Sequence, residues 1–450
     1  MVAALAVGVL VPFTGTHGGL SILVAVFLAL AVVGTLFALP LRYLPAITLL
    51  AALLVPTELS LFPRELQGAS LGIVPLVVWT IRAPRSAKIP VGLRLFALTF
   101  AVWLVLCLSF EPLRTNKGVE WFVSVGMALV FSILSTPEGL RSDAFRPLFL
   151  KVTTVLGAYA ILEGFVLHHN PLFGTLLQHT SWWASQTRSA SYRATTLLGH
   201  PLVNGLVFST AAVLAASDLA QRSRRTLPSL VRFLVLVGAT DATHSRGATI
   251  ALGVGVLVVI IFSRSLGRTG AARRLVLAMS LIVAALVLVY GLQAREESRG
   301  GQVSAQIRVA VIKRATEVVK RVGPFGAGPG ESEAYRRAQR LPGWEQDLEN
   351  SYAQLAVSLG PIGALLFTCL LLSVVAYGLR NDAVTGETAA LIALLIDISG
   401  FNAIEGHTNV TILISLLVIA VVSTPRPRPY ARGDLASTPP QLAFPPAHPV

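Results

Sequence analysis

Charged residues are scarce in this chain. Among its 450 residues, Asp, Glu, Lys and Arg together make up 13%, whereas hydrophobic residues make up 54%. Soluble domains carry roughly 25% charged residues, so this scarcity excludes a soluble globular protein and indicates a membrane protein. The net charge of +14 comes from Lys and Arg clustered between apolar runs. Membrane proteins use positive charge in this way, so it does not indicate nucleic-acid binding.

Cysteine is almost absent, since Cys107 and Cys369 are the two cysteines of the chain. Both lie inside apolar runs, where buried free thiols are expected. They offer neither a disulfide framework nor the spacing of a metal site, so we expect no metal and no cofactor. The sequence also lacks Lys and Arg before its first apolar run. That run therefore has no signal-peptide n-region and is expected to remain in the membrane.

Apolar runs recur along nearly the whole chain. A transmembrane helix needs about 17–25 largely apolar residues. The runs that reach or nearly reach this length are 20–39, 93–110, 147–168, 246–263, 275–292 and 351–377. The shorter runs are 2–13, 43–55, 70–81, 119–135, 200–216, 233–240, 388–400 and 408–423. Together they predict an all-α, polytopic transmembrane helical bundle of about 12–14 spans, the lower number if two short runs are re-entrant or interfacial.

Clusters of Lys and Arg set the predicted orientation, because cytoplasmic loops carry an excess of these residues. The clusters expected in the cytoplasm lie at 82–94, 222–232, 264–274 and 426–432. The connections that then fall on the extracytoplasmic side are 169–199, 241–245, 293–350 and 401–407. Because the number of spans is even, both termini are expected in the cytoplasm.

The chain divides into three predicted parts. Residues 1–168 form N-terminal transmembrane helices, residues 169–423 form a second transmembrane domain, and residues 424–450 form a proline-rich tail expected to be disordered. The second domain includes the large extracytoplasmic loop 293–350. Within this loop, residues 304–322 place valine and isoleucine on one face at helical spacing. The pattern predicts an amphipathic helix on the membrane surface or against the bundle.

Polar residues gather in four segments on the predicted extracytoplasmic side. The first runs from Tyr192 to Gly205 and includes Arg193, His200 and Asn204; the second is Ser245-Arg246-Gly247; the third combines Arg308 with Gly326, Gly328 and Gly330; the fourth begins Glu349-Asn350-Ser351-Tyr352. Polar groups at membrane depth are costly and normally face a cavity or one another. Their location on one side is therefore the strongest functional signal in the sequence.

The residue types in these segments indicate a reaction class. Arginines bind phosphate or diphosphate through charge-assisted, often bidentate hydrogen bonds. A nearby carboxylate can accept the proton of an attacking hydroxyl. Diphosphate is a good leaving group once its charge is held, so such a site needs no metal or nucleotide in principle. The pattern favours transfer of a group from a lipid diphosphate donor to a hydroxyl acceptor.

In their residues and order, the four segments resemble the O-antigen ligase and polymerase family. The resemblance covers roughly residues 190 to 377, and its last motif extends from Glu349-Asn350 to Gly360 and Gly363. It implies an α-helical membrane enzyme that carries glycans from a polyprenyl diphosphate donor to a glycan, lipid or protein hydroxyl acceptor outside the cytoplasmic membrane. The family's ligases have a histidine before the asparagine of this motif, and the resemblance assigns it to acceptor activation. Here that position is Glu349.

We predict Glu349 and Arg246 as catalytic residues, with Glu349 as the base and with inversion at the anomeric carbon. The predicted substrate-binding residues are Arg193, Arg308, His200, Asn204, Ser245, Asn350 and Gly328. Two intramembrane acids, Glu163 and Asp397, are further candidates, because such acids are functional by default. They could line the acceptor side or could pair with an arginine in the bundle.

Most of these residues also have a structural interpretation. Arg246 could be an ordinary surface arginine that snorkels to the membrane interface, and the arginines of the amphipathic stretch could bind anionic lipid headgroups. His200 could pack at the start of its span, and Asn204 could hydrogen-bond between helices. Asn350 could cap a helix beginning near Ser351, with Glu349 facing the helix dipole. The glycine run could be a hinge instead of a phosphate cradle.

Two other functions stay open at this point. One is secondary transport of a small anion such as bicarbonate, which would favour polar groups at mid-membrane and detectable repeats. The other is a non-catalytic role in envelope assembly. The polar residues gather at one predicted boundary of the membrane, which favours the transferase. The sequence does not distinguish ligation from polymerisation.

Overall fold

The structure is a computed structural model that describes residues 31–55, 71–83, 89–110, 118, 121–135, 142–172, 192–221, 226–262, 315–339, 348–381 and 384–424. Throughout these ranges the regular elements are helices, and no strand is present in them. The all-α prediction is therefore confirmed. The predicted runs 2–13 and 275–292, the tail from 425 onwards and Arg308 lie outside the described residues.

Several helices of the described part are long and apolar enough to cross a membrane. Four such spans are Val91–Ser109 (α5), Phe145–Leu167, Pro201–Ala220 and Gly360–Leu379 (α16). A fifth is possible by length and composition in the pair Ala31–Ala38 and Leu41–Leu54, which is bent by 110°. The chain is thus a multi-pass membrane protein, and the larger number of about 12–14 spans stays a prediction.

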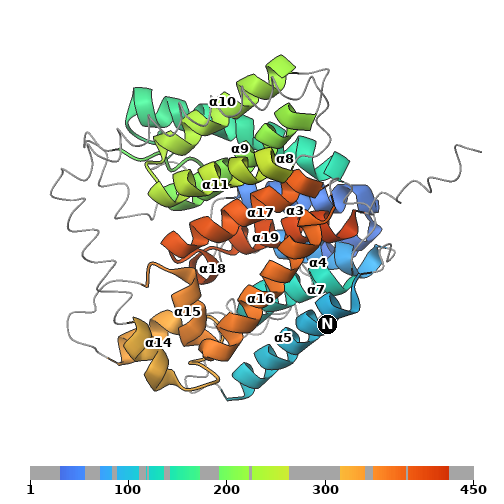
Figure 1. Ribbon diagram of the computed structural model, residues 1–450, viewed down its shortest axis with the longest axis vertical. Helices are drawn as coiled ribbons and strands as arrows, with labels where there is room; N and C mark the ends of the chain where they lie inside the picture. Colours follow the sequence, from blue (N-terminus) through green and yellow to red (C-terminus); the bar gives the residue numbers. More distant parts are fainter. Residues whose placement is uncertain are drawn as a thin grey trace, which may run out of the picture.

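The remaining bundle helices are shorter or more polar. They are α3 (Leu44–Leu54), α4 (Ile73–Arg82), α7 (Ala128–Ser135) after the π-helix Phe122–Met127, α10 (Thr226–Ala242), α11 (Arg246–Phe262), α17 (Thr385–Asp397) and α19 (Thr408–Ser423). The span Phe145–Leu167 consists of most of α8 (Ser142–Ile161) and the π-helix Leu162–Leu167. The short helices α14 (Ser332–Ala338), α15 (Ser351–Ser358) and α18 (Ala403–Gly406) lie at one end of the bundle, at the left in Figure 1.

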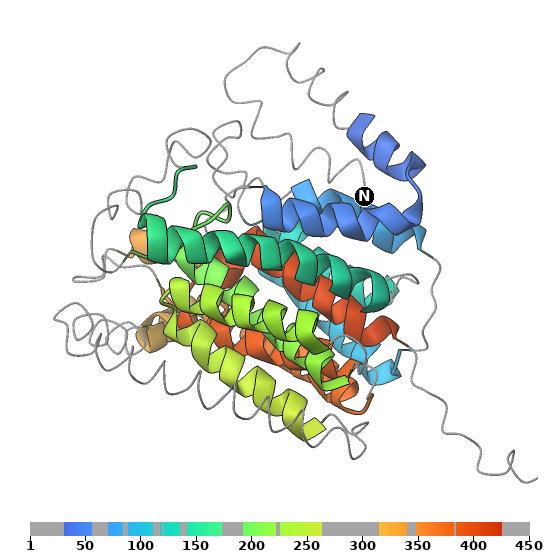
Figure 2. The same ribbon diagram turned by 90° about the horizontal axis from the view of Figure 1, so that it is seen from above.

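The helix α9 (Pro201–Gln221) is the central element of the bundle. It packs against α8, α10, α11 and α17, and these helices run side by side in Figures 1 and 2. Its span is 94% buried, compared with 28% for that of α5. A helix that is apolar all round and this deeply buried belongs to the core of a bundle, whereas α5 presents side chains to the surroundings.

Small residues let the central helices approach closely. A Cβ built on Gly255 of α11 would lie 2.4 Å from Cγ2 of Val213 on α9 and 3.1 Å from Cβ of Ala393 on α17. Three helices therefore meet at a point where not even a methyl group fits. Close approach at small residues is the usual means of packing helices in membranes, where the lipid gives no hydrophobic driving force.

A buried ion-pair cluster joins three helices at one end of the bundle. Arg146 of α8 lies 2.9 Å from Asp218 of α9 and 3.5 Å from Glu387 of α17. Its guanidinium also donates a hydrogen bond to the Leu214 carbonyl. Buried charges are stable only when they are paired and hydrogen-bonded. The cluster therefore fixes how these helix ends are placed relative to one another.

The prediction of one span over 351–377 is wrong. The chain breaks between Ser358 and Gly360, so that α15 is a separate short helix and α16 begins at Gly360. Gly360 has φ +71, a conformation that glycine adopts without steric cost, and Pro361 follows within the first turn of α16, where proline is favoured. Hydropathy does not detect this break because the sequence is apolar on both of its sides.

The segment 323–331, which contains the glycine run, packs across this break. A Cβ on Gly360 would lie 1.9 Å from the Pro324 carbonyl oxygen. From the other side, Trp103 of α5 donates a hydrogen bond to the Leu359 carbonyl at 2.9 Å. Irregular backbone at membrane depth is tolerated only where its polar groups are satisfied within the protein, and these contacts meet that requirement.

The amphipathic stretch is confirmed as a helix over 315–322, the part that the structure describes. Val318 is buried in a small apolar cluster with Ala327, Leu348 and Val357. Glu317, Lys320 and Arg321 are exposed. Of the two placements left open by the sequence, this part of the helix packs against the protein.

We expect Gly360→Ala to destabilise the protein, because the methyl group would clash with Pro324 and positive φ costs about 1–2 kcal/mol for other residues. Gly253→Ala is a matched control, since a Cβ at this helical position meets nothing within 4 Å. The control should be neutral or stabilising by up to about 1 kcal/mol. Thermal unfolding of both variants in detergent measures the difference. Equal melting temperatures for the two variants would contradict the packing described.

Candidate functional site

The described parts of the four predicted polar segments, which leave out Arg308, lie at the end of the bundle where α9, α11, α16 and α19 begin and α10 and α17 end. We call this the site end. Its irregular parts are residues 192–200, 243–245, 326–331, 348–350 and 398–407. Each of these parts contacts another of them or the short helix α15, as the following paragraphs describe.

Glu163 fixes the segment 192–200. This buried carboxylate lies in the π-helix that ends the α8 span, and it accepts hydrogen bonds from Tyr192 Oη at 2.6 Å, from Thr195 N at 2.7 Å and Oγ1 at 2.9 Å, and from Thr196 N at 3.0 Å. The sequence left open that Glu163 pairs with an arginine, but none of these contacts is to an arginine. Glu163 instead satisfies the backbone of the segment that carries Arg193.

Asn204 holds the other side of the same segment. It donates to the Thr195 carbonyl and, at 3.0 Å, to the His200 carbonyl, and it accepts from Thr196 Oγ1. Thr196 has φ +43, a left-handed conformation that costs energy for a β-branched residue. The hydrogen bonds of Asn204 and Glu163 stabilise that conformation. Asn204 therefore has a structural role, but its partners lie in the segment before its own helix and not, as the sequence suggested, on another helix. Its contact with substrate stays a prediction.

The first and second polar segments are joined directly. Arg193 Nε donates to the Thr243 carbonyl at 2.9 Å, and Ala194 N donates to the Ala242 carbonyl at 3.0 Å. Ser245 is buried, and its Oγ accepts from Ala248 N at 3.3 Å, so that it caps the helix on which Arg246 is the first residue. The structure thus brings Arg193 and Arg246 onto neighbouring segments, both half-buried.

Asp397 lies beneath the second segment. It ends α17 and is 1% exposed. A Cβ on Gly247 would be 2.6 Å from its Oδ1, so the carboxylate packs directly against the residue that follows Arg246. Asp397 therefore belongs to the same site end, as the sequence suggested.

The fourth segment is held by residues 395–403. Asn350 Oδ1 accepts from Ala353 N at 2.9 Å and Nδ2 donates to the Ser399 carbonyl at 2.8 Å. Ser351 Oγ donates to the Phe401 carbonyl and accepts from Ala403 N, both at 2.8 Å. The expectation that Asn350 caps a helix beginning at Ser351 is confirmed. Glu349 precedes this cap and is exposed.

The glycine run docks onto the carboxyl end of α15. Ala327 N donates to the Val357 carbonyl at 2.8 Å, and Gly328 N donates to the Ser358 carbonyl at 3.0 Å. These two amide groups are therefore engaged within the protein. The run acts as a structural link between the third and fourth segments, and a contact of Gly328 with substrate stays a prediction.

Glu405 connects α18 to both neighbours. It accepts short hydrogen bonds from Ser332 of α14 and Ser358 of α15. The pKa of Glu405 is raised to about 7. Burial is the main cause, the nearby Glu333 adds to it, and the hydrogen bonds from the two hydroxyl groups act in the opposite direction. The sequence predicted the connection 401–407, which contains Glu405, on the same side as the polar segments, but it gave no sign of this linking role.

Two histidines join the first segment to residues 398–407. The rings of His200 and His407 have their centroids 4.9 Å apart, and Phe401 lies beside both. Burial lowers the pKa of His200, and the neighbouring His407 and Arg193 lower it further. Burial also lowers the pKa of His407 to about 4. Both imidazoles are therefore neutral at neutral pH, and His200 packs at the start of its span as the sequence suggested.

The arrangement can hold an anion beside neutral side chains. Arg193 and Arg246 supply positive charge, the two imidazoles add none near pH 7, and Glu349 lies on the exposed side. Among the residues that the structure describes, no three His, Cys, Asp or Glu side chains are grouped to hold a metal ion. The roles assigned to individual side chains stay predictions, although all of the described ones lie at the site end.

We expect Glu163→Gln to loosen the segment 192–200. Glutamine offers one acceptor oxygen and a donor group in place of a carboxylate that accepts four hydrogen bonds, so at least one buried donor loses its partner, at a cost of about 1–3 kcal/mol. Tyr192→Phe removes one of these bonds and should cost less. Thermal unfolding and limited proteolysis at the segment measure both variants. A larger effect of Tyr192→Phe would contradict the central position of Glu163.

The raised pKa of Glu405 predicts a pH dependence of stability. The folded protein holds the carboxyl proton more tightly than the unfolded chain, so this contribution is complete below pH 4.5 and is lost as the pH rises to about 7. Glu405→Gln stays neutral and should lack this loss. The stability of the wild type relative to the variant should therefore fall between pH 5 and pH 7.

Unfolding midpoints measured across this pH range check the prediction. His407, whose lowered pKa makes stability fall as the pH falls from 6.5 to about 4, is present in both proteins, and its contribution cancels in the difference. A wild-type advantage that grows with pH would contradict the assignment.

The comparison with known protein families gives one match. Residues 231–368 match the model of a family described as O-Antigen ligase. The matched region contains the second and third polar segments and the fourth up to the middle of α16, whereas Arg193 and residues 398–407 lie outside it. No curated protein matches the chain.

Proposed function

We propose that this multi-pass membrane protein, which carries an O-antigen ligase family domain at residues 231–368, transfers a glycan from a polyprenyl diphosphate carrier to a hydroxyl acceptor. The family is enzymatic and acts in O-antigen ligation or polymerisation, with lipid-linked glycans as substrates. The observation that carries the finer proposal is the direct hydrogen bond between the Arg193 and Arg246 segments at one end of the bundle. It places two guanidinium groups on adjacent backbone segments.

The site end faces the extracytoplasmic side in this proposal. Helix α10 begins and α19 ends at the opposite end of the bundle, and the basic clusters 222–232 and 426–432 lie next to these helix ends in the sequence. Loops rich in Lys and Arg stay in the cytoplasm. The opposite placement of the clusters and of the polar segments supports this orientation and a cytoplasmic location for the C-terminus.

The proposed reaction is a single displacement. Arg193 and Arg246 bind the diphosphate and stabilise the charge that develops on it. Glu349 takes the proton of the acceptor hydroxyl, whose oxygen attacks the anomeric carbon from the side opposite the diphosphate. The bond from this carbon to the diphosphate oxygen breaks, and its electron pair leaves with the lipid carrier. Inversion at the anomeric carbon follows, and the residues require no metal.

Glu349 is exposed, which suits a base that takes a proton from an acceptor arriving from outside the helix bundle. The acceptor is a large glycan, lipid or protein, which must reach the diphosphate without entering the bundle. A carboxylate just ahead of the Asn350 cap lies where such a molecule arrives, and the cap holds the start of α15 in place. Glu349 replaces the histidine of the family's ligases, so that the proton acceptor differs while its place in the segment is kept.

Transport of a small anion is less well supported. A transporter binds its substrate near the middle of the membrane, where helices are interrupted. In the described part, the break at Ser358–Gly360 belongs to the site end, and the buried ion-pair cluster of Arg146 belongs to the other end. Neither feature lies beside the middle of the central helix α9, where a transporter would be expected to bind its substrate.

The decisive measurement is glycan transfer by the purified full-length protein, given a polyprenyl diphosphate-linked oligosaccharide and no metal. We expect Arg246→Ala to lower kcat about 10²–10³-fold, as loss of a group that stabilises developing charge does. Glu349→Gln should lower kcat about 10²-fold or more if it is the base. Arg380→Ala, an exposed arginine after α16, is the control and should retain activity.

The outcomes separate the proposals. Activity that survives Arg246→Ala at the level of the Arg380→Ala control would refute the diphosphate-binding role. Transfer lost in Arg246→Ala but retained in Glu349→Gln would keep the transferase and remove the base assignment. Trapping of a covalent glycosyl-enzyme would refute the single displacement. Absence of transfer across several donors, together with anion uptake into vesicles, would favour the transporter.

A further inference from the structure

Glu333 joins the short helix α14 to the segment that carries Glu349. It lies in the first turn of α14, and its Oε1 accepts a hydrogen bond at 3.0 Å from the amide of Leu348, which comes 15 residues later in the chain. Its Oε2 accepts a hydrogen bond at 2.8 Å from Nε of Arg336, which lies one turn further along α14. The two oxygens of one carboxylate therefore connect α14 to the residue that precedes Glu349.

The helix α14 is itself held by the protein around it. Ser332, the residue before Glu333, donates a hydrogen bond to Glu405 of α18, and Glu405 also accepts one from Ser358 of α15. Arg336, the partner of Glu333 on α14, has a side chain that is 5% exposed. Glu333 therefore extends from a support that is fixed on both sides of it.

Leu348 is held by its side chain as well as by its backbone. The side chain is fully buried in the small apolar cluster with Val318, Ala327 and Val357. A buried amide group requires a hydrogen-bond partner, and Glu333 supplies it for Leu348. Hydrogen bonds to a carboxylate are stronger than those between neutral groups. Both parts of Leu348 therefore favour one position of the chain.

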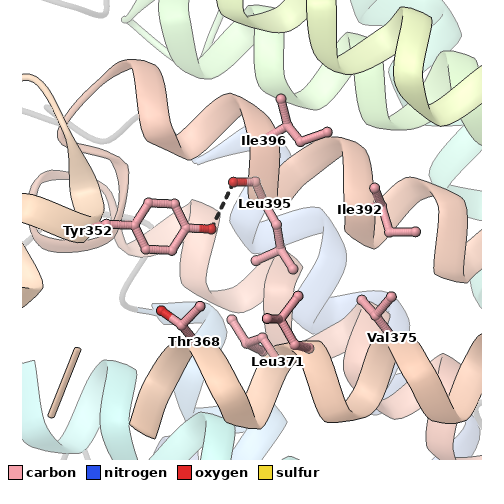
Figure 3. A pocket seen from close by; sticks show the side chains of 8 residues that line it. Tyr352, Thr368, Leu371, Val375, Ile392, Leu395 and Ile396 are labelled. Carbon is pink, nitrogen blue, oxygen red and sulfur yellow. Dashed lines mark hydrogen bonds between the residues drawn. The ribbon is translucent and has the colours of Figure 1, made fainter. Parts of the chain in front are cut away.

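The chain after Glu349 is fixed in a similar way. Asn350 caps α15, and its Nδ2 donates to the Ser399 carbonyl at 2.8 Å. In the first turn of α15, Tyr352 Oη donates to the Leu395 carbonyl of α17 at 2.9 Å, and Figure 3 shows this ring reaching across to α17. Glu349 therefore has a fixed neighbour on each side, although its own side chain is exposed.

A fixed backbone matters for a base of this kind. Glutamate has one more rotatable bond than histidine, and holding a long side chain in one geometry costs conformational entropy. A fixed backbone limits the region that the Glu349 carboxylate can reach, so that less of this cost falls on the reaction. A displacement of about 1 Å can lower a rate about 10²-fold, so the contacts on both sides of Glu349 bear on catalysis.

We propose that Glu333 is a positioning residue, which places the Glu349 carboxylate at the acceptor hydroxyl by holding the Leu348 amide. This inference rests on the proposed function, in which Glu349 takes the proton of the acceptor. Glu333 acts through the backbone and touches neither donor nor acceptor. The helix α14 is thereby part of the catalytic arrangement.

The first test measures kcat and KM for the glycan donor with purified full-length variants that elute as monodisperse species. Glu333→Ala should lower kcat about 10–10²-fold and leave KM within about twofold, because other segments bind the diphosphate. Glu333→Gln keeps an oxygen that can accept from the Leu348 amide and should retain most of the activity. Glu317→Ala, at an exposed glutamate of the helix 315–322, is the control and should behave as the wild type. A wild-type kcat in Glu333→Ala would overturn the proposal.

A double-mutant cycle separates positioning from a general effect on the fold. A carboxylate in the first turn of a helix also interacts favourably with the helix dipole, and loss of this stabilisation alone would lower activity in any background. If Glu333 acts through Glu349, Glu333→Ala should lower the residual kcat of Glu349→Gln by no more than about twofold, because the group it places is no longer a base. Costs that multiply in the double variant would overturn the proposal. Full activity of Glu349→Gln would refute the base assignment and the positioning role with it.

A spin label gives a measurement that does not depend on activity. The nitroxide is attached at Glu349→Cys in a protein that carries Cys107→Ser and Cys369→Ser, since these are the two native cysteines. Its spectrum should show a more mobile label after Glu333→Ala and no change after Glu317→Ala. An unchanged label after Glu333→Ala would overturn the positioning role and leave the transferase intact. A label that responds, in a protein whose wild type transfers no glycan, would support the contact and refute the proposed function.

Discussion

Backbone groups that helices leave unpaired must be satisfied by side chains at the site end, and the arrangement of the site depends on this requirement. Glu163 accepts hydrogen bonds from the backbone of Thr195 and Thr196. Ser351 bridges the Phe401 carbonyl and the Ala403 amide. An unsatisfied backbone group in a low-dielectric region costs several kcal/mol, so each of these contacts selects one conformation of its segment. The positions of Arg193 and Glu349 follow from the segments that carry them.

The helices supply the rigid part of the arrangement. The central helix α9 is enclosed by α8, α10, α11 and α17, and the ion-pair cluster of Arg146 fixes three of these five helices at the end away from the site. The irregular segments lie at the other end, where we propose that the acceptor binds. Sites built on rigid elements keep their geometry while connecting loops adapt to different ligands. The bundle therefore resists distortion at one end and presents its polar segments at the other.

Much of this could be predicted from the sequence because membrane insertion constrains sequence strongly. Apolar runs identified the long helices of the described part, although not α14, α18 or the break between α15 and α16, and the Asn350 cap followed from the preference of asparagine for that position. The convergence of Arg193, Arg246 and Asn350 at one end followed from alternating the basic loops across the membrane. Each of these predictions needed only the local sequence or the order of segments along the chain.

The parts that could not be predicted depend on tertiary contacts. The break before Gly360 lies in continuous apolar sequence, and it is stabilised by Trp103 and Pro324, which are distant in the chain. Residues 398–407 contact the first and the fourth polar segments and also α14 and α15, but no motif marks them, since Phe401 acts through its carbonyl and Glu405 through two serine hydroxyls. In the sequence, residues 398–407 are visible only as a polar, glycine-containing connection between two apolar runs. Such a pattern does not reveal which segments the connection contacts.

The triple contact at Gly255 has a consequence for how such sequences vary. Val213 and Ala393 leave no room for a side chain at this point, and a β-branched valine cannot turn aside easily because its χ1 angle is restricted. A gain of volume at any one of these positions must be balanced by a loss at another, so that the summed volume is conserved. Positions 213, 255 and 393 should therefore change together in relatives, as a record of helix packing that is independent of the chemistry at the site end.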